Sequence, residues 1–120
     1  VRCIVTKNTK DKPRSFFDNI DKWAKEQGAS GLAYFTIEKD VSAKGPVGKF
    51  FSKESLKEIM KLTGAKIGDS IFLACSKQKE LEKITSLARD KIAKDLDLID
   101  NNTFAFCWVV DYPMFERDEI

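Results

Sequence analysis

Ser70-Ile71-Phe72-Leu73-Ala74-Cys75 (SIFLAC) is the stretch that decides the fold. Its nearly continuous apolar run suits a strand in the centre of a sheet, where both faces are covered. The preceding Ile67-Gly68-Asp69 has the composition of a turn that leads into this strand. Two earlier stretches are rich in β-branched or aromatic residues and are also expected to be strands, Val1–Val5 and Leu32–Ile37.

Three amphipathic helices are expected between and after these strands. Apolar side chains recur at helical spacing after Pro13, and again in the segments that follow Ser52 and Ser76. A serine at these two positions can accept a hydrogen bond from a free backbone N–H group of the first turn. The expected helices begin near Pro13, at a cap on Ser52 and at a cap on Ser76, and they end at Gly28, at Gly64 and near Leu96.

Phe104–Val110 (FAFCWVV) carries the strongest strand signal of the chain and is unusually apolar for a terminal segment. We expect it to pair with the edge of the domain's own sheet, to dock on a neighbouring copy, or to be mobile beyond Asp111. Strands and helices alternate without a uniform repeat. The sequence therefore predicts an α+β fold, a two-layer sandwich with an antiparallel or mixed sheet of about four to five strands and helices on one face.

Composition excludes several classes of chemistry. The chain has 120 residues, the size of one domain, and contains no histidine, so a His-based catalytic couple or a His-ligated zinc site cannot form within it. Cys3, Cys75 and Cys107 are too far apart in sequence for a metal knuckle and are expected to be reduced core residues. No apolar run is long enough for a membrane span, and Val1–Val5 lacks the layout of a signal peptide.

Gly28-Ala29-Ser30-Gly31 raises the question of a phosphate-binding loop, because glycines let backbone N–H groups approach an anion. Such a loop follows a strand and precedes a helix, whereas this one follows a helix and precedes a strand. We therefore interpret it as a helix end and a turn.

The lysines of the second helix are the candidate site of contact with RNA phosphates. Lys53, Lys57 and Lys61 recur at every fourth position and so share one face, and Lys44 and Lys49 lie just upstream. Glu54 and Glu58 alternate with them, which is equally typical of a solvated helix that pairs its own charges. A net charge of +2 decides nothing between these two interpretations.

Several ordered segments resemble one known family. The most specific are GASGLAY and WVVDYPMFE, which are residues 28–34 and 108–116, and together the segments cover essentially the whole chain. They are Val1-Arg2, residues 28–34, 46–50 (PVGKF), 68–72 (GDSIF), 87–89 (LAR), 94–96 (KDL) and 108–116. In this order they are similar to the GAD domain that is inserted in bacterial-type aspartyl-tRNA synthetases and also occurs in the B subunit of the tRNA amidotransferase.

WVVDYPMFE separates the two contexts, because it resembles the run by which such synthetases return from the insertion to their class II catalytic domain. Tyr112 stands where that family more often has phenylalanine. The resemblance implies an insertion domain in residues 1–103 and a return strand toward the catalytic domain, truncated here, in residues 104–120. A stand-alone RNA-binding or dimerisation module and the amidotransferase domain remain the alternatives.

The resemblance also implies the chemistry of the parent enzyme. An aspartate–tRNA ligase activates aspartate with ATP and magnesium, transfers it to tRNA in the cytoplasm, and is a homodimer through its catalytic domain. None of the catalytic, ATP-binding or metal-binding motifs of that family lies in these 120 residues. The fragment alone is therefore expected to be non-catalytic, and to be a monomer or to self-associate weakly through Phe104–Val110.

Overall fold

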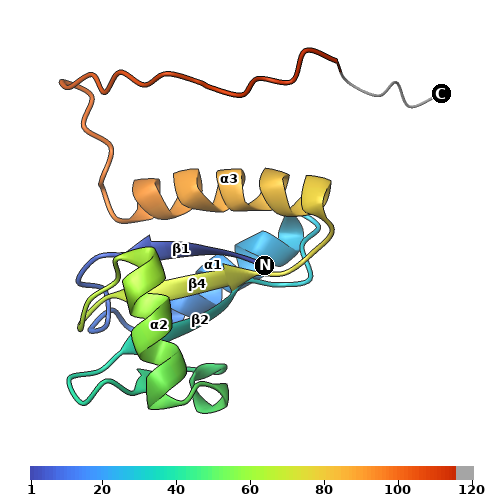
Figure 1. Cartoon of the computed structure of the whole chain (residues 1–120). Helices are drawn as coiled ribbons and strands as arrows, with labels where there is room; N and C mark the ends of the chain where they lie inside the picture. Colours follow the sequence, from blue (N-terminus) through green and yellow to red (C-terminus); the bar gives the residue numbers. More distant parts are fainter. Residues whose placement is uncertain (116–120) are drawn as a thin grey trace.

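The computed structural model describes residues 1–115 and shows a four-stranded sheet with helices packed against it (Figure 1). One short 3₁₀ helix, η1, joins the sheet to the second α-helix. The elements are, in chain order, β1 (Arg2–Thr6), α1 (Arg14–Glu26), β2 (Ala33–Ile37), β3 (Ala43–Lys44), η1 (Gly48–Phe50), α2 (Lys53–Thr63), β4 (Ser70–Ala74) and α3 (Gln78–Asp95).

β4 lies in the interior of the sheet, as its apolar sequence predicts. The strand order is β1-β4-β2-β3, and each neighbouring pair is antiparallel. β4 therefore pairs with β1 on one side and β2 on the other, and Ser70 lies opposite both Thr6 and Thr36. Because β1 and β2 both run antiparallel to β4, they are parallel to each other, and α1 connects them across β4.

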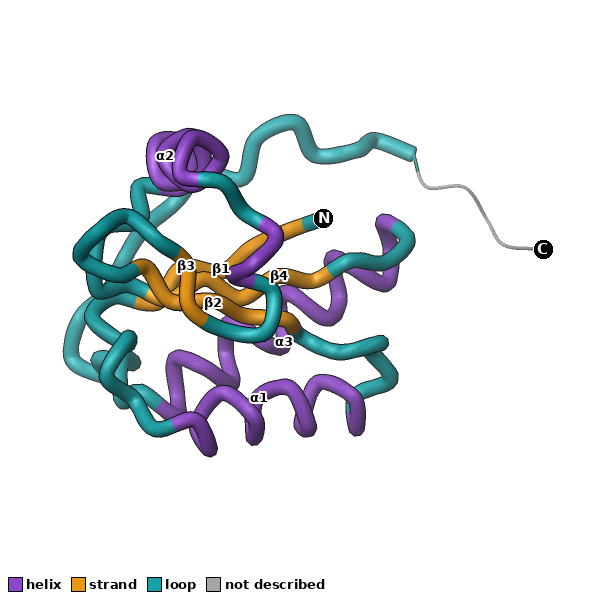
Figure 2. The backbone as a smooth tube through the Cα atoms, turned by 90° about the horizontal axis from the view of Figure 1, so that it is seen from below, coloured by secondary structure: helices purple, strands orange, loops and turns teal. Residues whose placement is uncertain are grey.

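Side chains of β2 and β4 alternate between two apolar cores, one on each face of the sheet. Tyr34 and Phe72 belong to the core under α1 and α3, whereas Phe35 and Ile71 belong to the core under α2. Figure 2 shows this division, with α2 on one side of the strands and α1 and α3 on the other. The prediction of helices on one face in two layers is thus wrong in this detail, because Leu56 of α2 is buried against the second face.

Aromatic packing fixes α1 on its face of the sheet. The ring of Phe17 stacks on that of Tyr34, with centroids 4.3 Å apart and planes 11° apart, and lies 5.7 Å from the ring of Phe72. Ile20 and Ala24 follow at helical spacing and are fully buried. The α+β class with an antiparallel sheet is therefore confirmed, and its larger core is built by residues that are far apart in sequence.

The ends of α2 agree with the sequence prediction. Ser52 is its N-cap and accepts a hydrogen bond from the backbone N–H of Ser55 at 3.2 Å. Gly64 ends the helix in the left-handed region at φ 67°, a conformation that costs glycine little because it has no Cβ atom. Phe51 and Leu56 lie in the same apolar core, as expected of a hydrophobic staple across the N-cap.

The N-cap of α3 differs from the prediction by one residue. Lys77 occupies the cap, and its side chain has no acceptor with which to receive a helix N–H group. The hydroxyl of Ser76 donates instead to Oε2 of Glu80 at 2.5 Å. The helix still begins at Gln78, because the buried side chains of Leu81 and Ile84 fix it on the sheet.

Residues 100–115, here called the tail, leave the end of α3 and run as extended chain beside the folded body without helix or strand (Figure 1). The predicted strand Phe104–Val110 is therefore not formed, and in the described residues it does not pair with an edge of the domain's sheet. Phe106 and Trp108 are 96% and 94% exposed. Glu116–Ile120, the last part of the predicted return segment, lie outside the described residues. No helix within residues 1–115 is long and apolar enough to cross a membrane.

Candidate functional site

The three candidate lysines lie on the outer side of α2. Lys53, Lys57 and Lys61 are all exposed, whereas Leu56 of the same helix is 1% exposed. The helix therefore presents its lysines to solvent at one-turn intervals, as the spacing predicts. Whether they contact RNA remains a prediction.

Acidic side chains lie beside these lysines. Hydrogen bonds from its own backbone N–H and from Ser52 lower the pKa of Glu54, and the positive charges of Lys57 and Lys53 lower it further. A hydrogen bond from Ser42 lowers the pKa of Asp40, and Lys53 contributes to the same shift. Part of the positive charge of α2 is thus compensated by its neighbours.

Lys44 does not extend the row on α2. It lies on β3 opposite Thr36, and the side chain of Thr36 shares a face of the sheet with Tyr34, which is the face that α1 covers. Lys49 is in η1, with its Nζ atom 5.2 Å from the ring centroid of Phe50. The structure therefore separates the five lysines of the predicted patch between two faces of the sheet.

Lys44 instead joins a groove that the sequence analysis did not find. The groove is a cavity of about 480 Å³, open to solvent, at the β3 edge of the α1 face. We call it the basic groove, because four of its lining side chains are cationic and none is acidic. Its lining residues are Lys10, Lys12, Arg14, Phe17, Tyr34, Thr36, Lys44, Gly45 and Pro46.

Short connections place the cations of the basic groove. The backbone N–H of Lys10 donates to the carbonyl of Gly68 at 3.0 Å, which ties the loop after β1 to the turn before β4. Gly45 at φ 137° packs directly on β2, since a Cβ atom there would lie 2.8 Å from the carbonyl oxygen of Tyr34. Lys44 and the loop carrying Lys12 are thus held at the same edge of the sheet.

Tyr34 is a nearly buried polar group in the wall of the basic groove. It is 8% exposed, and its hydroxyl has no hydrogen-bond partner within residues 1–115. Burial raises the pKa of Tyr34, the carboxylate of Asp18 raises it further, and the charge of Arg14 opposes both. The hydroxyl therefore stays protonated at neutral pH and is a hydrogen-bond donor.

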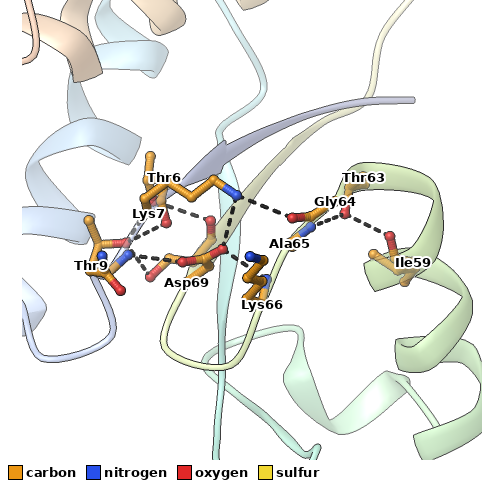
Figure 3. A network of polar contacts seen from close by, with 11 residues as sticks. Thr6, Lys7, Thr9, Ile59, Thr63, Gly64, Ala65, Lys66 and Asp69 are labelled. Atoms are coloured by element: carbon orange, nitrogen blue, oxygen red, sulfur yellow. Dashed lines mark hydrogen bonds and ion pairs between the residues drawn. The ribbon is translucent and has the colours of Figure 1, made fainter.

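A second polar cluster surrounds the carboxylate of Asp69, which is 2% exposed (Figure 3). The backbone N–H of Asn8 donates to Oδ1 at 2.9 Å, and that of Lys66 donates to Oδ2 at 2.8 Å. Lys7 places its Nζ atom 3.5 Å from Oδ2 and 3.2 Å from the carbonyl oxygen of Gly64. Asp69 thereby joins the loop after β1 to the loop after α2.

The pKa of Asp69 follows from these contacts. Burial alone would raise it, but the hydrogen bonds from Asn8 and Lys66 and the charge of Lys7 lower the pKa by more, so that it lies below its ordinary value. A chain of hydroxyl groups continues beside Asp69. The Oγ1 atoms of Thr6 and Thr9 are 2.7 Å apart, and the Thr9 hydroxyl donates to Oγ of Ser70 at 2.8 Å. Every group of this cluster already has a partner, which assigns it a structural role.

The glycine-rich loop has the geometry of a helix end. Gly28 follows the C-cap of α1 at φ 86°, as predicted. Oδ1 of Asp21 accepts the backbone N–H of Leu32 at 2.8 Å, so a carboxylate of α1 holds the end of this loop. A cavity of about 250 Å³ beside it is lined by both Glu80 and Lys83, and shows no excess of positive charge for an anion.

The cysteine prediction is wrong in one respect. Cys3, Cys75 and Cys107 are free thiols, but all three are exposed rather than buried in the core. Cys75 follows the last residue of β4, and Cys107 lies in the tail, so an apolar neighbourhood in sequence did not translate into burial. Among residues 1–115, no three Cys, Asp or Glu side chains are grouped so as to hold a metal ion.

Comparison with known proteins gives a consistent result. The family model described as the GAD domain matches residues 1–85. The chain is 84% identical over 122 aligned residues to an aspartate–tRNA(Asp/Asn) ligase of Pelagibacter ubique, an alignment that covers 100% of this chain and 20% of that protein. It is 47% and 44% identical to proteins of the same name from a Wolbachia of Brugia malayi and from Acidiphilium cryptum, covering 99% of this chain and 20% of each relative.

Proposed function

The chain belongs to the GAD domain family, and we propose that it is the non-catalytic insertion domain of an aspartate–tRNA ligase. The 84% identity along the whole chain to one such ligase, of which the chain spans 20%, carries this proposal. The relatives match beyond residue 85, where the family model ends, so the similarity includes the tail as well as the domain. A stand-alone module or the amidotransferase domain is not favoured, because these relatives are ligases.

The parent enzyme would activate aspartate with ATP and magnesium and transfer it to tRNA. This chain contains no histidine, and its nearly buried carboxylate Asp69 is fully engaged in hydrogen bonds. The catalytic groups therefore belong to the remainder of the parent, which would act as a homodimer in the cytoplasm with its substrates.

Aspartate-dependent exchange of pyrophosphate into ATP tests the parent's activity. We expect exchange and tRNA charging by the full ligase that carries this segment, and neither by the 120-residue chain. Exchange catalysed by the chain alone would contradict the non-catalytic assignment. Absence of exchange with aspartate in the full ligase would contradict the assignment of the parent.

The printed names of the relatives support a broader tRNA specificity than aspartate tRNA alone. All three are called aspartate–tRNA(Asp/Asn) ligases, and we propose the same for this parent. Charging of both tRNA transcripts with aspartate at comparable kcat/KM is the expected result. A preference of more than about a hundredfold for aspartate tRNA, which corresponds to about 2.7 kcal/mol, would limit the parent to one substrate.

Residues 104–120 are proposed to be the return strand toward the catalytic domain of the parent. The described residues of this segment form neither helix nor strand, and their large apolar groups are exposed in this chain. A sheet in the remainder of the ligase would give the unpaired backbone groups partners and bury those side chains. Hydrogen exchange on the full ligase tests this, because the amides of residues 104–110 should be protected there and unprotected in the 120-residue chain.

A further inference from the structure

Two of the four cations of the basic groove have an ion-pair partner. Lys10 pairs with Asp11 at 3.6 Å, and Arg14 pairs with Asp18 at 3.3 Å. Lys12 and Lys44 have no ion-pair partner within residues 1–115. Two cations therefore remain available to an anion in a concave surface, where converging charges raise the local potential.

The Tyr34 hydroxyl supplies a second, independent indication of a ligand. The Tyr34 residue is 8% exposed, and its hydroxyl has no hydrogen-bond partner within residues 1–115. No buried side-chain oxygen or nitrogen of these residues lacks a partner, so the hydroxyl reaches the solvent of the groove and is open to a ligand there. Stacking on Phe17 fixes the ring, so the hydroxyl keeps one position in the wall of the groove. A phosphate oxygen is an acceptor that matches both this donor and the surrounding cations.

The three lysines of α2 also have no ion-pair partner within residues 1–115, but α2 lacks the concave surface and the tyrosine donor. Lys53 and Lys57 lie beside Glu54, and Lys53 also acts on Asp40. None of the three α2 lysines lines the basic groove, the cavity beside the glycine-rich loop or the cavity between Asp21 and Tyr34. The row of lysines on α2 is thus an exposed helix surface with interleaved acids, whereas the groove gathers its cations in a cavity around a fixed donor.

We propose that the basic groove binds the sugar–phosphate backbone of tRNA, with Lys12 and Lys44 pairing with phosphates and the Tyr34 hydroxyl donating to a phosphate oxygen. The RNA-facing surface of this domain is then the α1 side of the sheet at the β3 edge. The identity of the RNA as tRNA rests on the proposed function of the parent. The contacts are to phosphates, so they position the RNA without reading its sequence.

Binding of fluorescently labelled tRNA to the 120-residue chain, followed by anisotropy at several salt concentrations, tests the groove directly. Lys12→Gln with Lys44→Gln should raise Kd by about tenfold and make the dependence of log Kd on log salt shallower by about 1.5, the value for two phosphate contacts. Tyr34→Phe removes only the hydroxyl and should raise Kd by about fivefold without changing that salt dependence.

Lys53→Gln with Lys57→Gln is the matched control, since it removes the same charge from α2. We expect its Kd to change by less than about twofold, as for exposed charges outside the contact. Circular dichroism of each variant establishes that it is folded. Equal losses in the groove and α2 variants, a larger loss in the α2 variant, or no tRNA binding by the wild-type chain would each overturn the inference.

The full ligase separates this inference from the proposed function. Aspartate-dependent pyrophosphate exchange by the wild-type ligase needs no tRNA and tests the parent's activity alone. In charging assays, the groove variant should raise KM for tRNA by about tenfold, in line with the loss of two phosphate contacts. If the wild-type ligase catalyses pyrophosphate exchange but the groove variant has an unchanged KM for tRNA, tRNA binding by the groove is refuted and the proposed function of the parent is not.

Discussion

The folded body and the tail contain similar aromatic residues in opposite surroundings. Phe72 of β4 is fully buried among the rings of Phe16, Phe17 and Tyr34, whereas Phe106 of the tail is 96% exposed. Both lie in apolar runs that predict strands. The difference is that β4 finds two strands to pair with inside this chain and residues 104–110 find none. Apolar β-rich sequence thus indicates a strand, but the presence of a partner decides whether it forms.

Replacing these two phenylalanines gives the largest expected effect. Phe72→Ala leaves a cavity between α1 and the sheet and should lower the free energy of unfolding by about 4 kcal/mol. Phe106→Ala should change it by less than about 0.5 kcal/mol, because an exposed side chain loses little on truncation. Urea denaturation followed by circular dichroism measures both. Similar losses in the two variants would show that the tail packs on the body in solution.

A carboxylate in each region offers the next comparison. Asp69 of the body and Asp100 of the tail both accept backbone N–H groups, but Asp69 is 2% exposed and Asp100 is exposed. Asp69→Asn places an amide donor against one of the two N–H groups and should cost about 2 kcal/mol. Asp100→Asn should cost less than about 0.5 kcal/mol in the same denaturation assay. A loss below about 0.5 kcal/mol for Asp69→Asn would mean that the cluster around it is not needed for stability.

Acid stability should follow the same carboxylate. Because the pKa of Asp69 in the folded chain lies below its unfolded value of about 3.9, its charged form contributes stability above about pH 4. That contribution is lost as the pH falls through the lowered pKa. The free energy of unfolding should therefore fall more steeply between about pH 5 and pH 3 in the wild type than in Asp69→Asn. Parallel pH profiles for the two proteins would assign the acid limb to other groups, such as Asp21, whose pKa is also lowered.

Removing the tail should have the smallest effect on stability. Deletion of residues 104–120 should change the free energy of unfolding by less than about 0.5 kcal/mol, since the described tail residues are exposed. The same deletion should reduce self-association in sedimentation velocity, because it removes a run of exposed aromatic groups. A loss of more than about 1.5 kcal/mol would show that the tail belongs to the fold of this chain.

The sequence predicts elements whose signals are local. Ser52 and Gly64 define the ends of α2 by capping chemistry that a few neighbouring residues supply, and both predictions are confirmed. The predicted cap of α3 at Ser76 is wrong by one residue, because serine is a preferred capping residue whereas packing of the helix on the sheet places Lys77, which cannot cap, at this position. The sequence does not indicate that helices cover both faces of the sheet, because that depends on which of the two cores Leu56 of α2 fills.

The candidate site shows the limit of local signals more clearly. The basic groove brings together the loop after β1, the start of α1 and the β2–β3 hairpin, so its cations have no common spacing in sequence. In the sequence, Tyr34 indicates only a strand. Only the structure shows that its hydroxyl lies in the wall of the groove without a hydrogen-bond partner in residues 1–115. Asp69 looks like an ordinary turn residue after Gly68, and its burial depends on loops that come from Asn8 and Lys66. The row of lysines on α2 could be predicted because it is periodic in the sequence. Periodicity does not show whether neighbouring acids compensate the charges.

The position of β4 in the strand order also has a consequence for synthesis on the ribosome. β1 and β2 do not pair with each other, and their shared partner is made only after α2. Thr6 and Ser70, joined by a hydrogen bond in the native sheet, are 64 residues apart in the chain. Such distant pairing slows folding, because a long loop must close before the β1–β4 ladder forms. A nascent chain that has not yet released residues 70–74 from the exit tunnel can therefore pair only β2 with β3, and the β1–β4 and β2–β4 ladders form late.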